Sequence, residues 1–322
     1  MANTPVFTTD AFKAATTDAA GRVWIGSNKF GLYYREDTTW NLAGVLTSHD
    51  IMHLVSDPTD GTIWAAQRGT GSSGGNTNTN GGINHILTPS TNDYYGFTSG
   101  MPSRAAWGVT VFPSGDAYSS HGGQTTASNV AGGGLGKILD GNTTGSSFYT
   151  GLDYQGGTYT GSNSVPYYGQ ILHAIGNNGS EFWVNVVSGC DNGSCSESRI
   201  NRYSSSGSFL GSITAANSPI PFVNSSSPVA RAILFDRQGR AWVGMNSGGI
   251  YVYDTNGTWT HLDETNSTFP AGAAVNFHSI AEDQDGKIFI GTSAGLVVFD
   301  GLYLSIQSSY SLFRRVLKIS FF

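Results

Sequence analysis

The sequence predicts an all-β fold: a β-propeller of six four-stranded blades, with seven blades as the alternative. One motif recurs six times along the 322 residues, and each copy holds short strands bounded by turn residues. No useful helical period occurs before the C-terminal segment. Four antiparallel strands repeated radially are the pattern of a propeller blade. We therefore expect a single β-propeller domain over residues 1–322.

The repeated motif is a strand, a turn rich in Gly, Asp or Asn, and a second strand that carries an aromatic residue. A third strand follows in every copy, and a less regular fourth strand closes most copies. The motif is clearest at 18–26, 236–244 and 283–291, recognisable at 57–65, and weakest at 113–118 and 177–183. The blades are expected at roughly 10–46, 47–100, 101–165, 166–225, 226–272 and 273–322.

The closing strand of the last blade has two candidates. The short apolar segment at residues 4–9 would pin the ring shut from the N-terminal side. Residues 302–306 compete for the same place, and the sequence does not choose between them. The basic and apolar tail from Phe313 is expected to be a packed terminal segment.

The sixth copy resembles a known repeat. Its residues Asn276-Phe277-His278-Ser279-Ile280-Ala281-Glu282-Asp283, then Asp285-Gly286-Lys287-Ile288-Phe289-Ile290-Gly291-Thr292 and Gly295-Leu296, are similar to the two-component-regulator propeller repeat. That family is common in bacterial periplasmic sensor domains and secreted proteins. The resemblance implies the propeller fold, an extracellular or periplasmic location, and attachment to other domains in a longer protein. It says little about activity, because propellers host many functions.

The composition limits the classes of molecule that the protein is expected to bind. The net charge is −6 and only 12% of residues are charged, which argues against nucleic acid, whose phosphates need a basic stripe. We expect no membrane span, because no apolar run is long enough to cross a bilayer. No signal peptide is recognised at the N-terminus. No phosphate-binding, nucleophile-elbow or zinc-protease motif occurs, so we expect no cofactor and no metal.

The two cysteines lie close together. Cys190 and Cys195 flank a turn that contains Asp191-Asn192-Gly193. A small hairpin of this kind could bring the two sulfurs together, and such a pair is expected to form a disulfide in an oxidising compartment. A metal site is not expected, since no further ligand set surrounds the pair.

Large polar or aromatic side chains recur at one position of the repeat, eleven residues before the second-strand aromatic (ten in the fourth copy). This position is near the start of the innermost strand, at the mouth of the central channel. It holds Lys13, His53, Trp107, His173, Arg231 and His278. They either fill the channel mouth or contact a ligand there, because convergent polar groups in a concavity are typical of sites.

Two carboxylates lie three residues before that position in the first two copies. Asp10 and Asp50 would then sit on neighbouring blades at the channel rim. Such a pair is what glycoside hydrolysis requires. The alternative is that both residues belong to ordinary strand-entry turns.

Three consecutive blades carry long loops between their second and third strands. The insertions are expected at roughly 67–81, 120–133 and 185–198, on the face where the innermost strands start. The second contains His121, a candidate ligand-binding residue, and the third contains the cysteines. These loops form either a one-sided wall over the channel or variable surface segments.

Three functional hypotheses follow. The first is a binding propeller that holds a small polar ligand or glycan, with Trp107 for stacking and with Lys13 and Arg231 as donors. The second is a carbohydrate-active enzyme. A lyase would use His53, His173 or His278 as base, with Arg231 or Lys13 facing a uronate carboxylate. A hydrolase would use Asp10 and Asp50. The third is a scaffold that binds other proteins through its rim.

Overall fold

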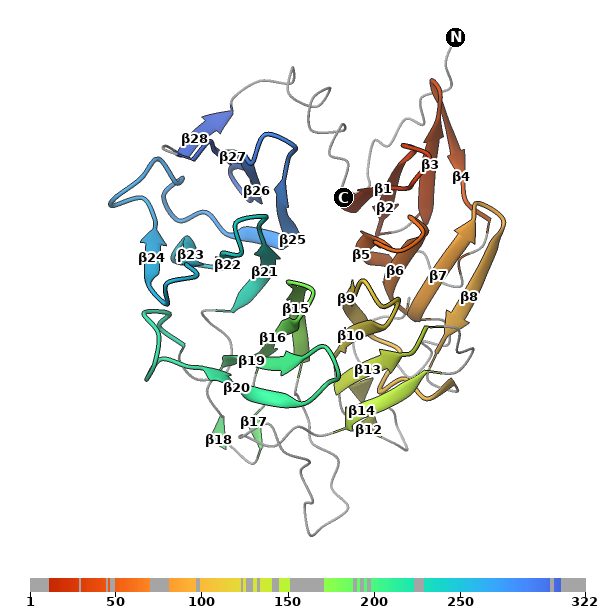
Figure 1. The fold of residues 1–322 in the computed structure, drawn as a ribbon, viewed down its shortest axis with the longest axis horizontal. Helices are drawn as coiled ribbons and strands as arrows, with labels where there is room; N and C mark the ends of the chain where they lie inside the picture. The colour runs from red at the N-terminus through yellow and green to blue at the C-terminus, as the bar shows by residue number, and fades with distance from the viewer. Residues whose placement is uncertain are drawn as a thin grey trace. The chain divides into compact units, whose positions relative to one another are not determined.

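The structure, a computed structural model, confirms the predicted fold class: a six-bladed β-propeller of six four-stranded antiparallel sheets (Figure 1). It describes residues 12–307 except 29, 45, 47–49, 70–80, 97–98, 123, 126–129, 132–133, 141–144, 151–170, 188–189, 192–193, 196–197, 223–228 and 302–303. The chain divides between Leu172 and His173 into two compact units of three blades each. Each unit is described in its own right.

The first unit contains blades one to three, each numbered from its first strand, the innermost strand of a propeller blade. Blade one is β1 (Phe12–Thr17), β2 (Val23–Ser27), β3 (Leu32–Glu36) and β4 (Thr39–Leu42). Blade two is β5 (Asp50–Ser56), β6 (Ile63–Arg68), β7 (Gly82–Thr88) and β8 (Thr91–Tyr95). Blade three is β9 (Ala106–Val111), β10 (Ala117–His121), β13 (Gly134–Ile138) and β14 (Ser146–Thr150), with a small ladder of β11 (Gln124–Thr125) and β12 (Val130–Ala131). Strand β5 contacts both β1 and β9, so the first strands of the three blades are neighbours.

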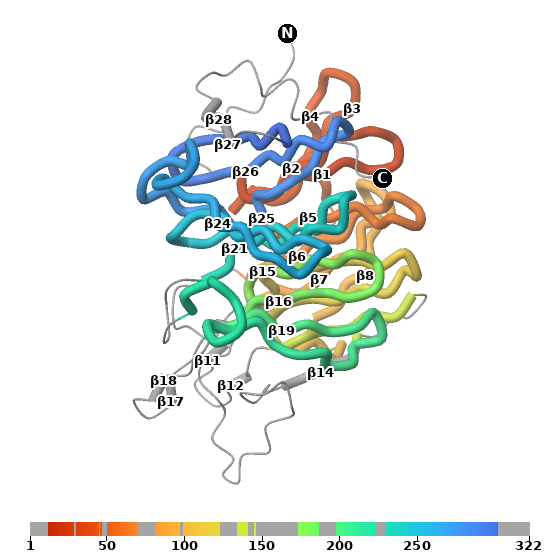
Figure 2. Tube along the Cα trace, turned by 60° about the vertical axis from the view of Figure 1, so that its left-hand side comes forward, coloured from red at the N-terminus to blue at the C-terminus, as the bar shows by residue number. Residues whose placement is uncertain are grey.

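The second unit contains blades four to six. Blade four is β15 (Ile171–Asn177), β16 (Glu181–Val187), β19 (Arg199–Ser204) and β20 (Phe209–Ile213), with a small ladder of β17 (Cys190–Asp191) and β18 (Ser194–Cys195). Blade five is β21 (Ala230–Phe235), β22 (Ala241–Met245), β23 (Ile250–Tyr253) and β24 (Trp259–Leu262). Blade six is β25 (Val275–Glu282), β26 (Ile288–Thr292), β27 (Gly295–Phe299) and β28 (Leu304–Gln307). Figure 2 shows these three blades following one another in chain order.

Strand β28 settles one of the open alternatives. It pairs with β27 along its whole length, from Leu296 opposite Gln307 to Phe299 opposite Leu304. The fourth strand of blade six therefore comes from the C-terminal candidate segment. The competing segment at 4–9 and the basic tail after Phe313 lie outside the described residues.

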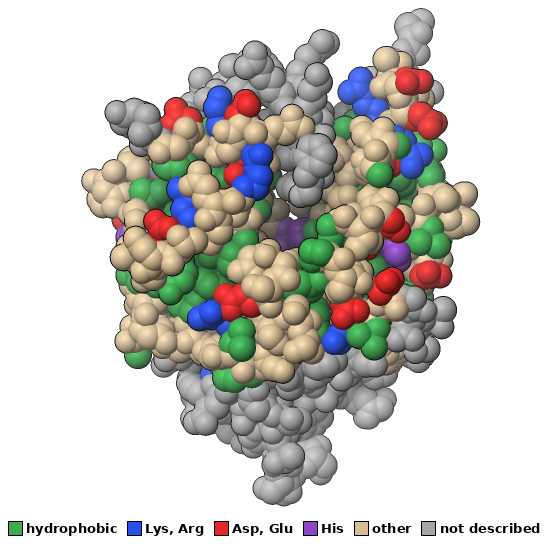
Figure 3. Space-filling view, in the orientation of Figure 1, with side chains coloured by type: hydrophobic (Ala, Val, Ile, Leu, Met, Phe, Trp, Pro, Cys, Tyr) green, Lys and Arg blue, Asp and Glu red, His purple; other side chains and the backbone are tan. Residues whose placement is uncertain are grey.

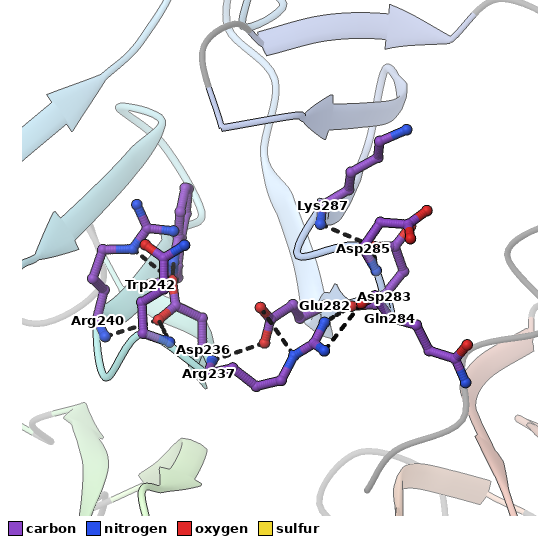
Figure 4. Close-up of polar contacts among 10 residues, drawn as sticks. Asp236, Arg237, Arg240, Trp242, Glu282, Asp283, Gln284, Asp285 and Lys287 are labelled. Carbon is purple, nitrogen blue, oxygen red and sulfur yellow. Dashed lines mark hydrogen bonds and ion pairs between the residues drawn. The ribbon is translucent and has the colours of Figure 1, made fainter.

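One carboxylate explains why the motif joins an Asp to an aromatic. The Asp236 side chain accepts hydrogen bonds from the backbone N–H groups of Gln238 and Arg240, from Arg240 Nε at 2.6 Å and from the Trp242 indole at 2.8 Å (Figure 4). Asp18 holds Trp24 in the same way. The Asp therefore closes the first turn of the blade and satisfies a buried indole N–H, so turn and core form together.

The glycine two positions after the Trp is a packing requirement. A Cβ on Gly244 would lie 2.6 Å from Val275 Cγ1 of the next blade, and one on Gly26 would lie 2.5 Å from Ile51 Cγ2. Adjacent blades within each unit share hydrophobic clusters at these contacts. The motif therefore specifies the close approach of successive blades.

Blades five and six are also joined at the far end of their first strands. The backbone N–H of Arg237 donates to Glu282 Oε2 at 2.8 Å, and its guanidinium donates to the carbonyls of Gln284, at 3.1 Å, and Asp283 (Figure 4). Arg237 is largely exposed. It lies just beyond the C-terminal end of β21, whereas Arg231 lies near the N-terminal end.

Candidate functional site

In three blades, the candidate residue is the extra residue of a β-bulge at the start of the first strand. Between β1 and β2 the pairing skips Lys13, between β9 and β10 it skips Trp107, and between β21 and β22 it skips Arg231. A bulge releases one residue from the ladder and re-aims its side chain, and bulges are frequent beside functional sites. In these three blades, the residues that the sequence repeat aligns therefore occupy the same structural position.

Blade two departs from the predicted alignment. The Asp57–Trp64 hydrogen bond spans seven positions, whereas the equivalent Asp18–Trp24 bond spans six. The longer turn shifts the register, so the residue in the bulge is Met52, and His53 is paired with Ala66. His53 Nδ1 accepts a hydrogen bond of 3.3 Å from the backbone N–H of Val109 in blade three. The equivalence of His53 with Lys13 was wrong, and His53 links two blades.

The first unit carries a cluster around Asp50. Its buried carboxylate accepts from Lys13 Nζ at 2.6 Å through one oxygen and from Arg68 at 2.8 Å through the other. The Arg68 guanidinium lies 5.3 Å from the centroid of the Trp107 ring. The structure therefore brings together Lys13, Asp50 and Trp107, with Arg68 as a fourth member that was not predicted from the sequence. Asp10, which the hydrolase hypothesis pairs with Asp50, lies outside the described residues.

Replacing Asp50 with asparagine is expected to lower the free energy of unfolding by about 2 kcal/mol, because two partly buried cations lose their counter-charge. Partial exposure of Lys13 and Arg68 keeps this below the cost of a fully buried pair. Urea denaturation measures the change. Asp285→Asn, in the exposed first turn of blade six, is the matched control. An unchanged midpoint in Asp50→Asn would show that its ion pairs contribute nothing to folding.

The second unit carries a different cluster, centred on Phe277 of β25. The Arg231 guanidinium carbon lies 4.9 Å from the Phe277 ring centroid, and its Nη1 donates to the Val275 carbonyl at 3.4 Å. The His173 ring meets Phe277 edge-on, with centroids 5.2 Å apart. Burial, together with the nearby His278 and Arg231, lowers the pKa of His173 to about 3. His173 is therefore neutral at neutral pH.

His278 sits in an irregular stretch of β25. Pairing with β26 is interrupted between Val275 and Ile280, and His278 has a φ of 50°, in the left-handed region. The Ser279 hydroxyl holds the stretch by hydrogen bonds to the carbonyls of Asn276, at 2.8 Å, and Gly291, at 2.7 Å. A non-glycine residue in this conformation costs about 1 kcal/mol or more and is often found at functional sites. The irregularity places Phe277 and His278 beside Arg231 and His173.

His121 is a structural residue of the core. It is the last residue of β10 and is fully buried, whereas the sequence pattern predicted it in a loop insertion. Its Nδ1 donates to the Ser103 carbonyl at 2.9 Å, and its Nε2 accepts from Ser119 Oγ at 2.8 Å. Burial lowers its pKa to about 4. A ligand has no access to this side chain, so the assignment of His121 to a binding role was wrong.

The long loops lie mostly outside the described residues. Strand β6 extends the second strand of blade two to Arg68, so Gln67 belongs to the blade and is fully buried. In blade four the backbone pairs Cys190 directly opposite Cys195 on the small β17–β18 ladder. This register suits the predicted disulfide, which stays a prediction because their side chains are not described.

One described group has the composition of a metal site. Ligand atoms of Asp57, Asp60 and His85 lie within 4.8 Å of one another. Each is already engaged: Asp57 by Thr59 and Trp64, Asp60 by Thr62, and His85 Nε2 by the Thr62 hydroxyl at 2.6 Å. His85 also stacks on Trp64. These contacts indicate that the three side chains stabilise the first turn of blade two.

The surface in Figure 3 is mostly neutral. On that face, Lys and Arg side chains lie singly or beside acidic groups, and the described atoms form no continuous basic stripe. The part of the chain that the structure describes contains no helix long and apolar enough to cross a bilayer.

Comparison with known proteins identifies solved structures that share the fold of this chain. No protein-family profile and no curated protein matches the sequence. Among solved structures, the extracellular domain of the putative one component system BT4673 from B. thetaiotaomicron matches with a TM-score of 0.57 and 19% identity, over 95% of this chain and 34% of that chain. The extracellular domain of the putative hybrid two component system BT4673 matches with a TM-score of 0.56 and 19% identity, over 94% of this chain and 34% of that chain, so the likeness to two-component-system propellers is confirmed. It holds at the level of the fold, and this chain spans about a third of the length of that domain.

Two further structures share this fold. PorZ, a surface component of the type-IX secretion system of Porphyromonas gingivalis, matches with a TM-score of 0.56 and 15% identity, over 90% of this chain and 38% of that chain. The gluconolactonase XC5397 from Xanthomonas campestris matches with a TM-score of 0.53 and 12% identity, over 92% of this chain and 86% of that chain. An extracellular domain of a signalling system, a secretion component and a gluconolactonase thus share one fold, so the fold alone does not specify a function.

Proposed function

We propose that this chain is an extracellular or periplasmic recognition domain that binds a small polar ligand or glycan at the starts of its first strands. The observation that carries the proposal is the recurrent bulge, which releases Lys13, Trp107 and Arg231 from their ladders. A purely structural position would hold an apolar residue, as Met52 does in blade two. Three blades instead present two cations and an indole.

The chemistry of these side chains suits a sugar. In the first unit, Trp107 offers a large ring with an apolar face and a polar N–H, while Lys13 and Arg68 are hydrogen-bond donors for hydroxyl oxygens. Arg68 and Lys13 are fixed by Asp50, so their donors are held in place before a ligand arrives. A few fixed polar groups beside an aromatic surface are typical of small-ligand sites.

The enzyme alternatives have weaker support at two of their residues. A base works best with a pKa near the operating pH, and the pKa of about 3 makes His173 a poor one. Each oxygen of Asp50 is bound by a cation, which leaves it unsuited to deliver a proton to a glycosidic oxygen. The location and the attachment to further domains are supported by the extracellular domain of BT4673, which is longer than this chain.

A glycan-array screen followed by calorimetric titration tests the proposal. Trp107→Ala is expected to weaken binding of the best glycan about 10-fold or more, as for truncation of a binding hot spot. Trp40→Ala on the outer strand β4 is the matched control and should bind like the wild type. Binding of no glycan by the wild type, or equal binding by Trp107→Ala, would refute it. In the latter case the rim of the domain, as in the scaffold hypothesis, would be the next surface to test.

A further inference from the structure

We infer that Arg231, with His173 and Phe277, forms a subsite for the carboxylate of an acidic sugar, an inference that rests on the proposed function. All three residues belong to blades four to six. The sequence left two cations, Lys13 and Arg231, as alternatives for such a contact. The structure distinguishes them by their partners.

Lys13 already has an anion. Its ammonium group lies 2.6 Å from Asp50 Oδ1, so a ligand carboxylate would compete with a buried protein carboxylate. Arg231 differs: among the described residues, no carboxylate forms an ion pair with it. Its contacts are the carbonyl of Val275 and the face of Phe277. Arg231 is therefore the cation of this pair that a ligand anion can engage without displacing a protein group.

Partial burial makes that arrangement costly without a ligand. Desolvation lowers the pKa of Arg231, which means that the surroundings disfavour its charge. One cation–π contact and one long hydrogen bond to a carbonyl offset only part of this cost. An anion would supply the missing counter-charge and two parallel N–H donations, the geometry in which guanidinium binds a carboxylate.

The neighbouring groups shape the subsite for a single negative charge. His173 is neutral at neutral pH, so it adds a hydrogen-bonding ring without a second positive charge. The Arg231 guanidinium lies over the ring of Phe277, and the His173 ring packs against Phe277 at nearly a right angle. These contacts fix the positions of Arg231 and His173. One fixed cation matches a carboxylate monoanion better than a phosphate dianion, whose sites usually gather several cations. The irregular backbone at His278 is what brings Phe277 into this position.

The test compares digalacturonate with its dimethyl ester, which has the same two rings but no charge. Calorimetric titration at neutral pH is run on the wild type, on Arg231→Gln and on Arg237→Ala. Arg237 is the matched control, an exposed arginine beyond the other end of β21. Inorganic phosphate is titrated as a third probe. Thermal denaturation of each variant confirms that it is folded, and Arg231→Lys serves as a second variant that keeps the charge but loses the planar fork.

The wild type and Arg237→Ala are expected to bind digalacturonate about 10-fold or more tightly than the ester, because only the acid can accept charge-assisted hydrogen bonds from the guanidinium. Arg231→Gln should lose this preference, and Arg231→Lys should retain part of it. Equal binding of acid and ester by the wild type, or a preserved preference in Arg231→Gln, would overturn the inference and leave the proposed function standing. Phosphate that binds as tightly as digalacturonate would overturn the carboxylate assignment. If no glycan bound at all, the proposed function would fail as well.

Discussion

Replacing Asp236 with alanine is expected to lower the free energy of unfolding by about 4 kcal/mol. The side chain is fully buried and accepts four hydrogen bonds, from two backbone N–H groups, Arg240 and Trp242. Without it, a buried indole N–H and the partly buried Arg240 guanidinium lose their acceptor. A buried donor left without a partner costs about 1–3 kcal/mol, and a charge whose partner is removed costs more.

Asp236→Asn sharpens this test. The amide can still accept from the backbone N–H groups through its oxygen, but its NH₂ group would then face the donors of Arg240 and Trp242. We expect it to recover less than half of the lost stability. Asp285→Ala, in the exposed first turn of blade six, is the control and should change the unfolding midpoint little. Guanidinium denaturation followed by tryptophan fluorescence measures all three. A midpoint for Asp236→Ala equal to that of Asp285→Ala would contradict the role given to the buried carboxylate.

Acidification is expected to destabilise the protein through His121. In the unfolded chain His121 binds a proton near its ordinary pKa of 6.5, whereas burial lowers its pKa in the folded protein to about 4. Below pH 6.5 the unfolded state therefore binds more protons, and stability falls as the pH falls. The loss continues until about pH 4, where the folded protein also binds the proton. The difference in pKa corresponds to about 3 kcal/mol.

The variant His121→Gln isolates this contribution. Glutamine can keep a donor toward the Ser103 carbonyl and an acceptor for Ser119, but it does not titrate. Its stability should fall less steeply between pH 6.5 and 4 than that of the wild type. Carboxylates and His173, which stays in both proteins, contribute equally to the two curves. Denaturation curves at a series of pH values, with parallel slopes in the two proteins, would contradict the assignment.

Local features of the fold were predictable from the sequence. The Asp of the turn, the aromatic of the second strand and the glycine two positions later are all close in sequence, and each has one physical role repeated in several blades. The position of Lys13, Trp107 and Arg231 at one point of the repeat followed from the same spacing. What depends on a few neighbouring residues could therefore be inferred from the sequence.

Features that depend on register and on partners could not be predicted. A turn one residue longer in blade two replaced His53 by Met52 in the bulge. His121 was read as a loop residue because the strand β10 runs further than its apolar pattern. Arg68 was missed, although its charge is unusual so near the end of a second strand. Its importance comes from Asp50 and Trp107, which are distant in sequence.

The strand order within each blade has an evolutionary consequence. Every blade draws its four strands from one uninterrupted segment of chain, including the last, which ends with β28. Duplication or loss of one segment therefore adds or removes a whole ladder without breaking the hydrogen bonds of any other. Each segment can also vary at the start of its first strand without disturbing its turn, because other residues of the segment hold that turn. Four blades accordingly present lysine, methionine, tryptophan and arginine at the bulge of the first strand.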